Sequence, residues 1–151
     1  MPRRADVGRL YDQFGASLYR YALMILADPS AAADAVHDVF VAVMRGNAPF
    51  DNAGHYLRRA VRNECYSALR RRRTAASTDP LIEAVSTDDP DLRIAIERAL
   101  RELPPEQREV VHLKAFEGMT FQEIADAIGE SINTVASRYR YAMEKMRAQL
   151  G

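Results

Sequence analysis

The sequence has a single cysteine, no tryptophan and no long apolar run. Cys65 by itself cannot form an internal disulfide. The longest apolar run, at 21–27, is far short of the roughly 18 residues that a membrane-spanning helix requires. The first ten residues lack the apolar stretch of a signal peptide. We therefore expect a cytoplasmic protein without membrane insertion.

Side chains that form catalytic or metal sites are also scarce. The three histidines, His37, His55 and His112, fall in three separate predicted helices, and no His-x3-His or Cys-x2-Cys pair occurs. The sequence has no glycine-rich loop that could hold a phosphate, and Cys65 is more typical of a small packed side chain than of a nucleophile. We expect no enzyme activity, no cofactor and no metal site.

An excess of basic charge is lacking, since 21 Lys and Arg balance 21 Asp and Glu. A net charge of zero argues against nucleic acid as a partner, but the distribution of charge along the chain reverses this. Residues 1–73 carry 12 Arg and 7 acidic residues, residues 74–91 carry 5 acidic and no basic residues, and residues 131–151 carry 4 basic and 1 acidic residue. Two basic segments are therefore separated by an acidic one.

Apolar residues at spacings of three and four predict three helices in the first half of the chain, at about 6–26, 29–45 and 53–73. Asp28 and Pro29 are typical of a helix start. The segment 46–52 (GNAPFDN) is typical of a loop. In the first helix, the residues expected to face the core are Leu10, Tyr11, Phe14, Leu18, Tyr21, Ala22 and Ile25.

The segment 74–90 (TAASTDPLIEAVSTDDP) has no sustained periodicity and is rich in Ser, Thr and Asp, which is typical of a flexible linker. Beyond it, Asp89-Pro90 begins a helix that Pro104-Pro105 ends, and further helices follow. Patterns typical of strands are absent. We therefore predict an all-α protein with two small helical domains joined by an acidic linker, at 1–73, 74–90 and 91–151.

The stretch 120–150 has the layout of a helix-turn-helix. Thr120 and Glu123 predict a capping box, Gly129 falls where the turn requires a left-handed residue, and Ser131 can cap the second helix. A helical hairpin packed only for stability is the alternative, but it does not explain why these features occur together. The face expected in a major groove carries Ile132, Asn133, Ala136, Ser137, Arg140 and Glu144, with Arg138 at its flank.

Arginines crowd the predicted helix at 53–73. A charged helix end is often only solvated, and the run at 70–73 by itself is open to that interpretation. The same helix, however, carries three further arginines together with two tyrosines and an asparagine: Arg58, Arg59, Arg62, Tyr56, Tyr66 and Asn63. Arginine neutralises phosphate, while aromatic rings and asparagine bind unpaired bases. The sequence thus predicts two DNA-binding surfaces.

Over nearly its whole length the sequence resembles the extracytoplasmic-function (ECF) sigma factors of the sigma-70 family. Residues 10–45 and the Arg-rich helix resemble region 2. Residues 99–150, with LPPEQREVVHL and GMTFQEIADAIG, resemble region 4. The resemblance implies a protein that binds bacterial core RNA polymerase, recognises the −35 and −10 promoter elements and helps to melt promoter DNA. It also implies an anti-sigma factor as a partner.

The resemblance further implies site residues. The clamp-helices coiled coil of the polymerase largest subunit is expected to contact Asp34, His37, Asp38, Val39 and Phe40. The −10 element is expected at Asn47, Phe50, Asn52, Tyr56, Arg58, Arg59, Arg62, Asn63, Arg70 and Arg71. The −35 element is expected at Asn133, Thr134, Ser137, Arg138 and Arg140. The acidic linker resembles the segment that threads toward the RNA exit path, although its composition equally fits a plain tether.

The chain departs from the usual pattern of the family at a few positions. His37-Asp38 stands where Gln-Glu is usual, Tyr56 where Trp is usual, and Ser67 where Asp is common. His37-Asp38 preserves an acidic residue, and the other two replacements are compatible with the general role.

Two other interpretations remain open from the sequence. A sigma-like decoy that titrates an anti-sigma factor would fit the zero net charge, although it need not retain the Arg-rich helix. An ordinary helix-turn-helix repressor or activator would not explain the first domain. Co-purification with core polymerase and promoter-dependent transcription in vitro would separate these from a sigma factor.

The predicted recognition face is less basic than is usual, because Ala136 stands where many members of the family have lysine. We expect Ala136→Lys to raise promoter affinity and to steepen its salt dependence by about one released counterion, since lysine there would reach a phosphate. Titrations at several salt concentrations measure both quantities. A lysine variant with no salt-dependent gain would contradict a DNA-facing position.

Overall fold

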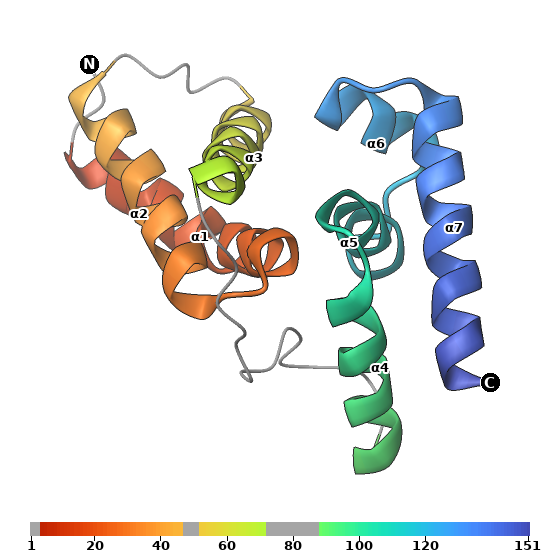
Figure 1. The fold of residues 1–151 in the computed structure, drawn as a ribbon. Coiled ribbons are helices and arrows are strands. Elements are labelled where there is room, and N and C mark those ends of the chain that lie inside the picture. Colours follow the sequence, from red (N-terminus) through yellow and green to blue (C-terminus); the bar gives the residue numbers. More distant parts are fainter. Residues whose placement is uncertain (1–3, 47–51, 72–87) are drawn as a thin grey trace. The chain divides into compact units, whose positions relative to one another are not determined.

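The computed structural model describes residues 4–46, 52–71 and 88–151, and the chain divides into two compact units, Met1–Ser77 and Thr78–Gly151. Helices and the turns between them make up the described ranges (Figure 1). The predicted all-α class with two small helical domains is confirmed. Of the predicted linker, residues 74–87 lie outside the described residues.

The first unit consists of three helices, each packed against the other two: α1 (Arg4–Leu26), α2 (Pro29–Arg45) and α3 (Ala53–Arg71) (Figure 1). Every residue from Tyr21 to Leu26 is buried. This run is longer than one helical turn, so the end of α1 is covered on all sides. The helices that cover it contribute Val36, Val39, Phe40, Val43, Leu57, Val61 and Cys65 to the core.

The other half of α1 differs from the sequence prediction. Tyr11, expected in the core, is 55% exposed, and Phe14 is half-buried against Gly54 of α3. Leu23 and Met24, outside the predicted face, are buried instead. Periodicity identifies one apolar face of a helix, but it does not say how many neighbouring helices cover each turn.

The second unit is organised around α7 (Ile132–Leu150), which packs against three other helices (Figure 1). These are α4 (Pro90–Glu102), α5 (Pro105–Val111) and α6 (Phe121–Ile128). The core of the unit includes Leu100, Leu103, Val110, Leu113, Ile124, Ile128, Val135 and Ala142. Among the large apolar side chains that stay exposed are Leu92, Ile94 and Phe116.

A buried arginine holds the join between α4 and α5. The guanidinium of Arg108 donates hydrogen bonds to the carbonyls of Leu103, at 2.7 Å, and Arg101, at 3.4 Å. Pro104 and Pro105 have no amide hydrogen, so they cannot donate to the carbonyls at the end of α4. The guanidinium of Arg108 supplies these carbonyls with a donor instead. After α5 the backbone forms a short π-helical turn, η1 (His112–Phe116), which the sequence did not lead us to expect.

The connection from α1 to α2 contains a residue in a costly backbone conformation. Ala27 has a φ of 53°, in the left-handed region, and its amide donates to the carbonyl of Leu23 at 2.8 Å. Asp28 then caps α2 by accepting a hydrogen bond from the amide of Ala31 at 3.2 Å.

We expect Ala27→Gly to raise the free energy of unfolding by about 0.5–1 kcal/mol. Glycine removes a left-handed cost of about 1–2 kcal/mol and adds back roughly 0.5–1 kcal/mol of chain entropy. Denaturant titration measures the difference. The matched control is Ala33→Gly, at an exposed position inside α2, which should destabilise the protein by about 1 kcal/mol. If both variants lose stability alike, Ala27 carries no backbone strain.

Candidate functional site

The outward face of α2 is acidic. Asp34, His37 and Asp38 lie on this face and are exposed. The other two residues expected to contact polymerase, Val39 and Phe40, are buried in the core of the first unit. The structure therefore brings three of the five to one surface, and the other two support that surface from beneath.

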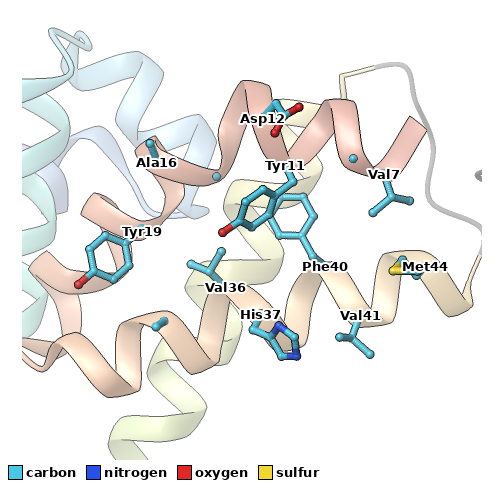
Figure 2. Close-up of a pocket in the computed structure, with 13 residues that line it drawn as sticks. Val7, Tyr11, Asp12, Ala16, Tyr19, Val36, His37, Phe40, Val41 and Met44 are labelled. Carbon is cyan, nitrogen blue, oxygen red and sulfur yellow. The ribbon is translucent and has the colours of Figure 1, made fainter. Parts of the chain in front are cut away.

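A groove of about 760 Å³ lies between α1 and α2 and includes His37 in its lining (Figure 2). Its walls are mostly apolar and aromatic. Figure 2 shows Tyr11 and Phe40 pointing toward one another between the two helices, and their ring centroids are 5.2 Å apart in an edge-to-face arrangement. Sequence reasoning missed this groove because it assigned Tyr11 to the core. The signal in the sequence is a set of small lining residues, Gly8, Gly15, Ala16 and Ala33.

Polar side chains gather along one face of α3. Tyr56, Arg59 and Asn63 are spaced by three and four residues and are all exposed. They lie on this face because Leu57, Val61 and Cys65, at regular spacings of four, turn inward. An exposed Arg70 falls on the same face further along the helix.

Four arginines of α3, including Arg70, make contacts within the protein. Arg58 lies over the ring of Tyr21 at 6.0 Å and Arg62 over the ring of Tyr66 at 4.6 Å. Near the end of the helix, Arg71 forms an ion pair with Glu64 at 3.3 Å, and Arg70 donates to the Ser67 hydroxyl at 3.0 Å. The basic surface of α3 is thus shaped by contacts with its own aromatic and acidic side chains.

The start of α3 adjoins a second, smaller hollow. Asn52 has a φ of 58°, and its backbone carbonyl accepts a hydrogen bond from the amide of Tyr56 at 3.1 Å. This hydrogen bond begins the helix. Asn47 and Phe50, expected at the −10 element, lie outside the described residues. Sequence reasoning did not anticipate the hollow, which has a volume of about 370 Å³ and is lined by Phe14, Ser17, Leu18, Gly54, His55 and Arg58.

The predicted helix-turn-helix is confirmed by its caps. The amide of Glu123 donates to the Thr120 hydroxyl at 3.1 Å, and the amide of Thr120 donates to a Glu123 carboxylate oxygen at 3.0 Å. Gly129 has a φ of 73°, which an L side chain adopts at a cost. Ser131 caps α7 by accepting the amide of Thr134 at 3.1 Å.

The outward face of α7 begins at the turn. Ile132 and Asn133 are exposed, while Ala136 and Ser137 are half-buried. The hydroxyl of Thr134 accepts a hydrogen bond from Ser131 at 2.9 Å, so it belongs to the cap. The two predicted DNA-binding arginines also have intramolecular contacts: Arg140 lies over the ring of Tyr141 at 5.1 Å, and Arg138 pairs with Glu130.

Metal-binding clusters and membrane-spanning helices are absent from the described part of the chain. Glu109 and His112 form a Glu-x2-His pair that sequence reasoning overlooked, and both are buried in the core of the second unit. Within 4–46, 52–71 and 88–151, no three His, Cys, Asp or Glu residues are grouped so as to hold a metal ion. No helix in the same ranges has the length and apolar character needed to cross a membrane.

Models of two protein-family regions match the chain. The model of sigma-70 region 2 matches residues 10–75, and that of sigma-70 region 4 matches residues 93–146. The ECF RNA polymerase sigma factor SigM of Mycobacterium tuberculosis is 32% identical over 149 residues, covering 95% of this chain and 76% of the relative. The corresponding SigK of Mycolicibacterium vanbaalenii is 26% identical over 156 residues, covering 93% and 80%.

Solved structures share the fold. The sigma factor RpoE from Bartonella quintana, in complex with the anti-sigma factor NepR, matches with a TM-score of 0.71 at 22% identity, over 96% of each chain. CnrH, in complex with the cytosolic domain of CnrY, matches with a TM-score of 0.66 at 25% identity, over 98% of this chain and 89% of CnrH.

The capping box makes the stability of the second unit depend on pH. Hydrogen bonds from the backbone and then the side chain of Thr120 hold the pKa of Glu123 below its ordinary value of 4.5. The stabilisation is therefore present above the pKa of the unfolded chain and is lost as the pH falls through the lower pKa of the folded protein.

We expect the stability difference between the wild type and Glu123→Gln to shrink as the pH falls from 7 toward 3, because only the wild-type side chain becomes protonated in that range. Denaturant titrations at each pH measure the difference. Glutamine keeps an oxygen acceptor for the cap, so it isolates the role of the charge. A difference that stays constant over this range would show that ionisation of Glu123 does not matter.

Proposed function

Because this chain belongs to the extracytoplasmic-function sigma factors of the sigma-70 family, we propose how its two units divide the work of promoter recognition. The protein is a sigma factor that acts in transcription initiation, together with core RNA polymerase and promoter DNA. We further propose that the polymerase supplies all of the catalysis and that the protein acts in the cytoplasm, where bacterial transcription takes place.

We propose that the exposed face of α3 binds the −10 element, and the composition of this face is the main support for the proposed function. Tyr56, Arg59 and Asn63 stand side by side on one helix face. An aromatic ring can stack on an unpaired base, a guanidinium can neutralise phosphate, and an amide can hydrogen-bond a base edge. Such a combination suits a melted strand better than a closed duplex.

We assign the −35 element to the start of α7. In a helix-turn-helix, the N-terminal residues of the second helix meet the base edges in the major groove. Asn133 is exposed there, and Ser137 lies one turn further along the helix. Both can hydrogen-bond base edges, while Arg140, also exposed, can reach phosphate.

We propose that core polymerase binds the acidic face of α2 and the groove beside it. Asp34, His37 and Asp38 provide polar contacts, and the apolar groove between α1 and α2 provides area that a partner can cover. Exposed aromatic and apolar side chains beside charged ones are typical of a protein interface. Two of the exposed apolar side chains are Tyr11 and Met44.

We also propose an anti-sigma factor as a partner. RpoE and CnrH are each solved in a complex, RpoE with its anti-sigma factor and CnrH with the cytosolic domain of CnrY. An anti-sigma factor that covered the α2 face would exclude core polymerase. Competition between the two for the purified protein tests this assignment.

The rival function, a decoy that titrates an anti-sigma factor without binding promoters, does not require the exposed polar face of α3. Reconstitution with core polymerase distinguishes the two. Run-off transcription over genomic fragments of the source bacterium should yield discrete transcripts that depend on this protein. If this protein binds core polymerase or an anti-sigma factor but yields no such transcripts, the result supports the decoy function.

We expect Arg59→Ala to lower run-off transcription roughly tenfold, because losing one phosphate or base contact costs about 1–3 kcal/mol. Arg20→Ala is the matched control, since Arg20 is exposed on α1 rather than on the α3 face. A template already unpaired at the −10 element should restore part of the loss if Arg59 helps to melt DNA. Equal transcript yields from the two variants would place the −10 element elsewhere.

A further inference from the structure

Arg138, at the flank of the predicted DNA face of α7, is held by an acidic residue of the preceding turn. Its Nη2 lies 3.6 Å from Oε1 of Glu130, with the arginine side chain 24% and the glutamate side chain 39% exposed. Side chains on a helix tilt toward its N-terminus, which allows Arg138 to reach back to this turn. The guanidinium therefore points toward the protein's own carboxylate.

The rest of this guanidinium is poorly satisfied. Nη1 of Arg138 is buried and has no hydrogen-bond partner within the described residues. A buried donor without a partner costs free energy. Because this nitrogen is buried, a DNA phosphate beside α7 can bind both terminal nitrogens of Arg138 only when the guanidinium leaves Glu130 and turns outward.

Glu130 also opposes DNA through its own charge. It directly precedes Ser131, the N-cap of α7. The start of a helix carries partial positive charge and attracts phosphate. A carboxylate at that point offsets the attraction, so the same side chain holds back one arginine and weakens the pull of the helix start.

We infer that Glu130 is an autoinhibitory residue, which withholds Arg138 from DNA. This inference rests on the proposed function, which places α7 on the −35 duplex. A DNA phosphate must displace Glu130 to gain a contact with Arg138, whatever the base sequence. Glu130 therefore weakens the sequence-independent part of DNA binding.

The experiment uses the full chain and a short labelled duplex of mixed sequence, titrated at several salt concentrations and followed by fluorescence anisotropy. We expect Glu130→Gln to tighten binding about three- to tenfold and to steepen the slope of log affinity against log salt by about one, the value of one added phosphate contact. The matched control is Asp126→Asn. Asp126 is exposed on α6, where it accepts a hydrogen bond from Gln122 at 2.9 Å.

The control changes the net charge by the same amount but releases no arginine. It should therefore tighten binding less than Glu130→Gln and leave the salt slope nearly unchanged. In an Arg138→Ala background, Glu130→Gln should tighten binding less than it does in the wild type and should no longer steepen the salt slope, because only its effect at the helix start remains. The inference is overturned if Glu130→Gln does not exceed the control, or if its gain and its change of slope are as large without Arg138. Equal Tm values across the variants would establish that folded proteins are being compared.

Ala136→Lys separates failure of this inference from failure of the proposed function. If the lysine variant tightens binding in a salt-dependent way while Glu130→Gln does not, α7 still faces DNA and only the role of Glu130 is wrong. If neither variant tightens binding, the placement of α7 on DNA is wrong, and the inference fails with it.

Discussion

The turn between α6 and α7 determines which side chains of α7 can reach a partner. The amides of Gly129 and Glu130 both donate to the carbonyl of Ala125, and the left-handed Gly129 reverses the chain before Ser131 starts the next helix. A helix turns by about 100° per residue, so the burial of two side chains of α7 fixes the direction of all the others. With the turn as it is, Val135 and Ala142 enter the core while Asn133 faces outward.

The first unit depends on a comparable constraint. Because every residue from Tyr21 to Leu26 is buried, α2 and α3 must both pack on the end of α1. The inward residues of α3 follow from that packing, and its polar face follows from the inward residues. The same arrangement leaves the groove between α1 and α2 open, lined by small residues on both helices. The core and the candidate surfaces are thus two consequences of one packing arrangement.

Intramolecular contacts reduce the basic character of both candidate DNA surfaces. Arg62 and Arg140 lie over aromatic rings, and Arg71 and Arg138 pair with acidic side chains. Each such contact is weak where it is exposed to solvent, so phosphate can compete with it. In the proposed function, the zero net charge and these contacts act in the same direction, because both weaken binding to the DNA backbone. In the proposed function, the affinity for promoters then comes from many contacts made together with the polymerase rather than from charge alone.

What the sequence determined by itself was local. The helices begin and end close to the predicted positions, and the capping box, the left-handed Gly129 and the Ser131 cap occur where their residue types require them, because these features depend on neighbours within a few positions. Resemblance supplied the family, and the assignments of individual DNA and polymerase contacts stay predictions. Only the tertiary structure decided that Tyr11 lines a groove, that Val39 and Phe40 lie inside, and that Arg138 meets Glu130. Burial and side-chain direction depend on which helices lie alongside, and the periodicity of one helix contains no information about its neighbours.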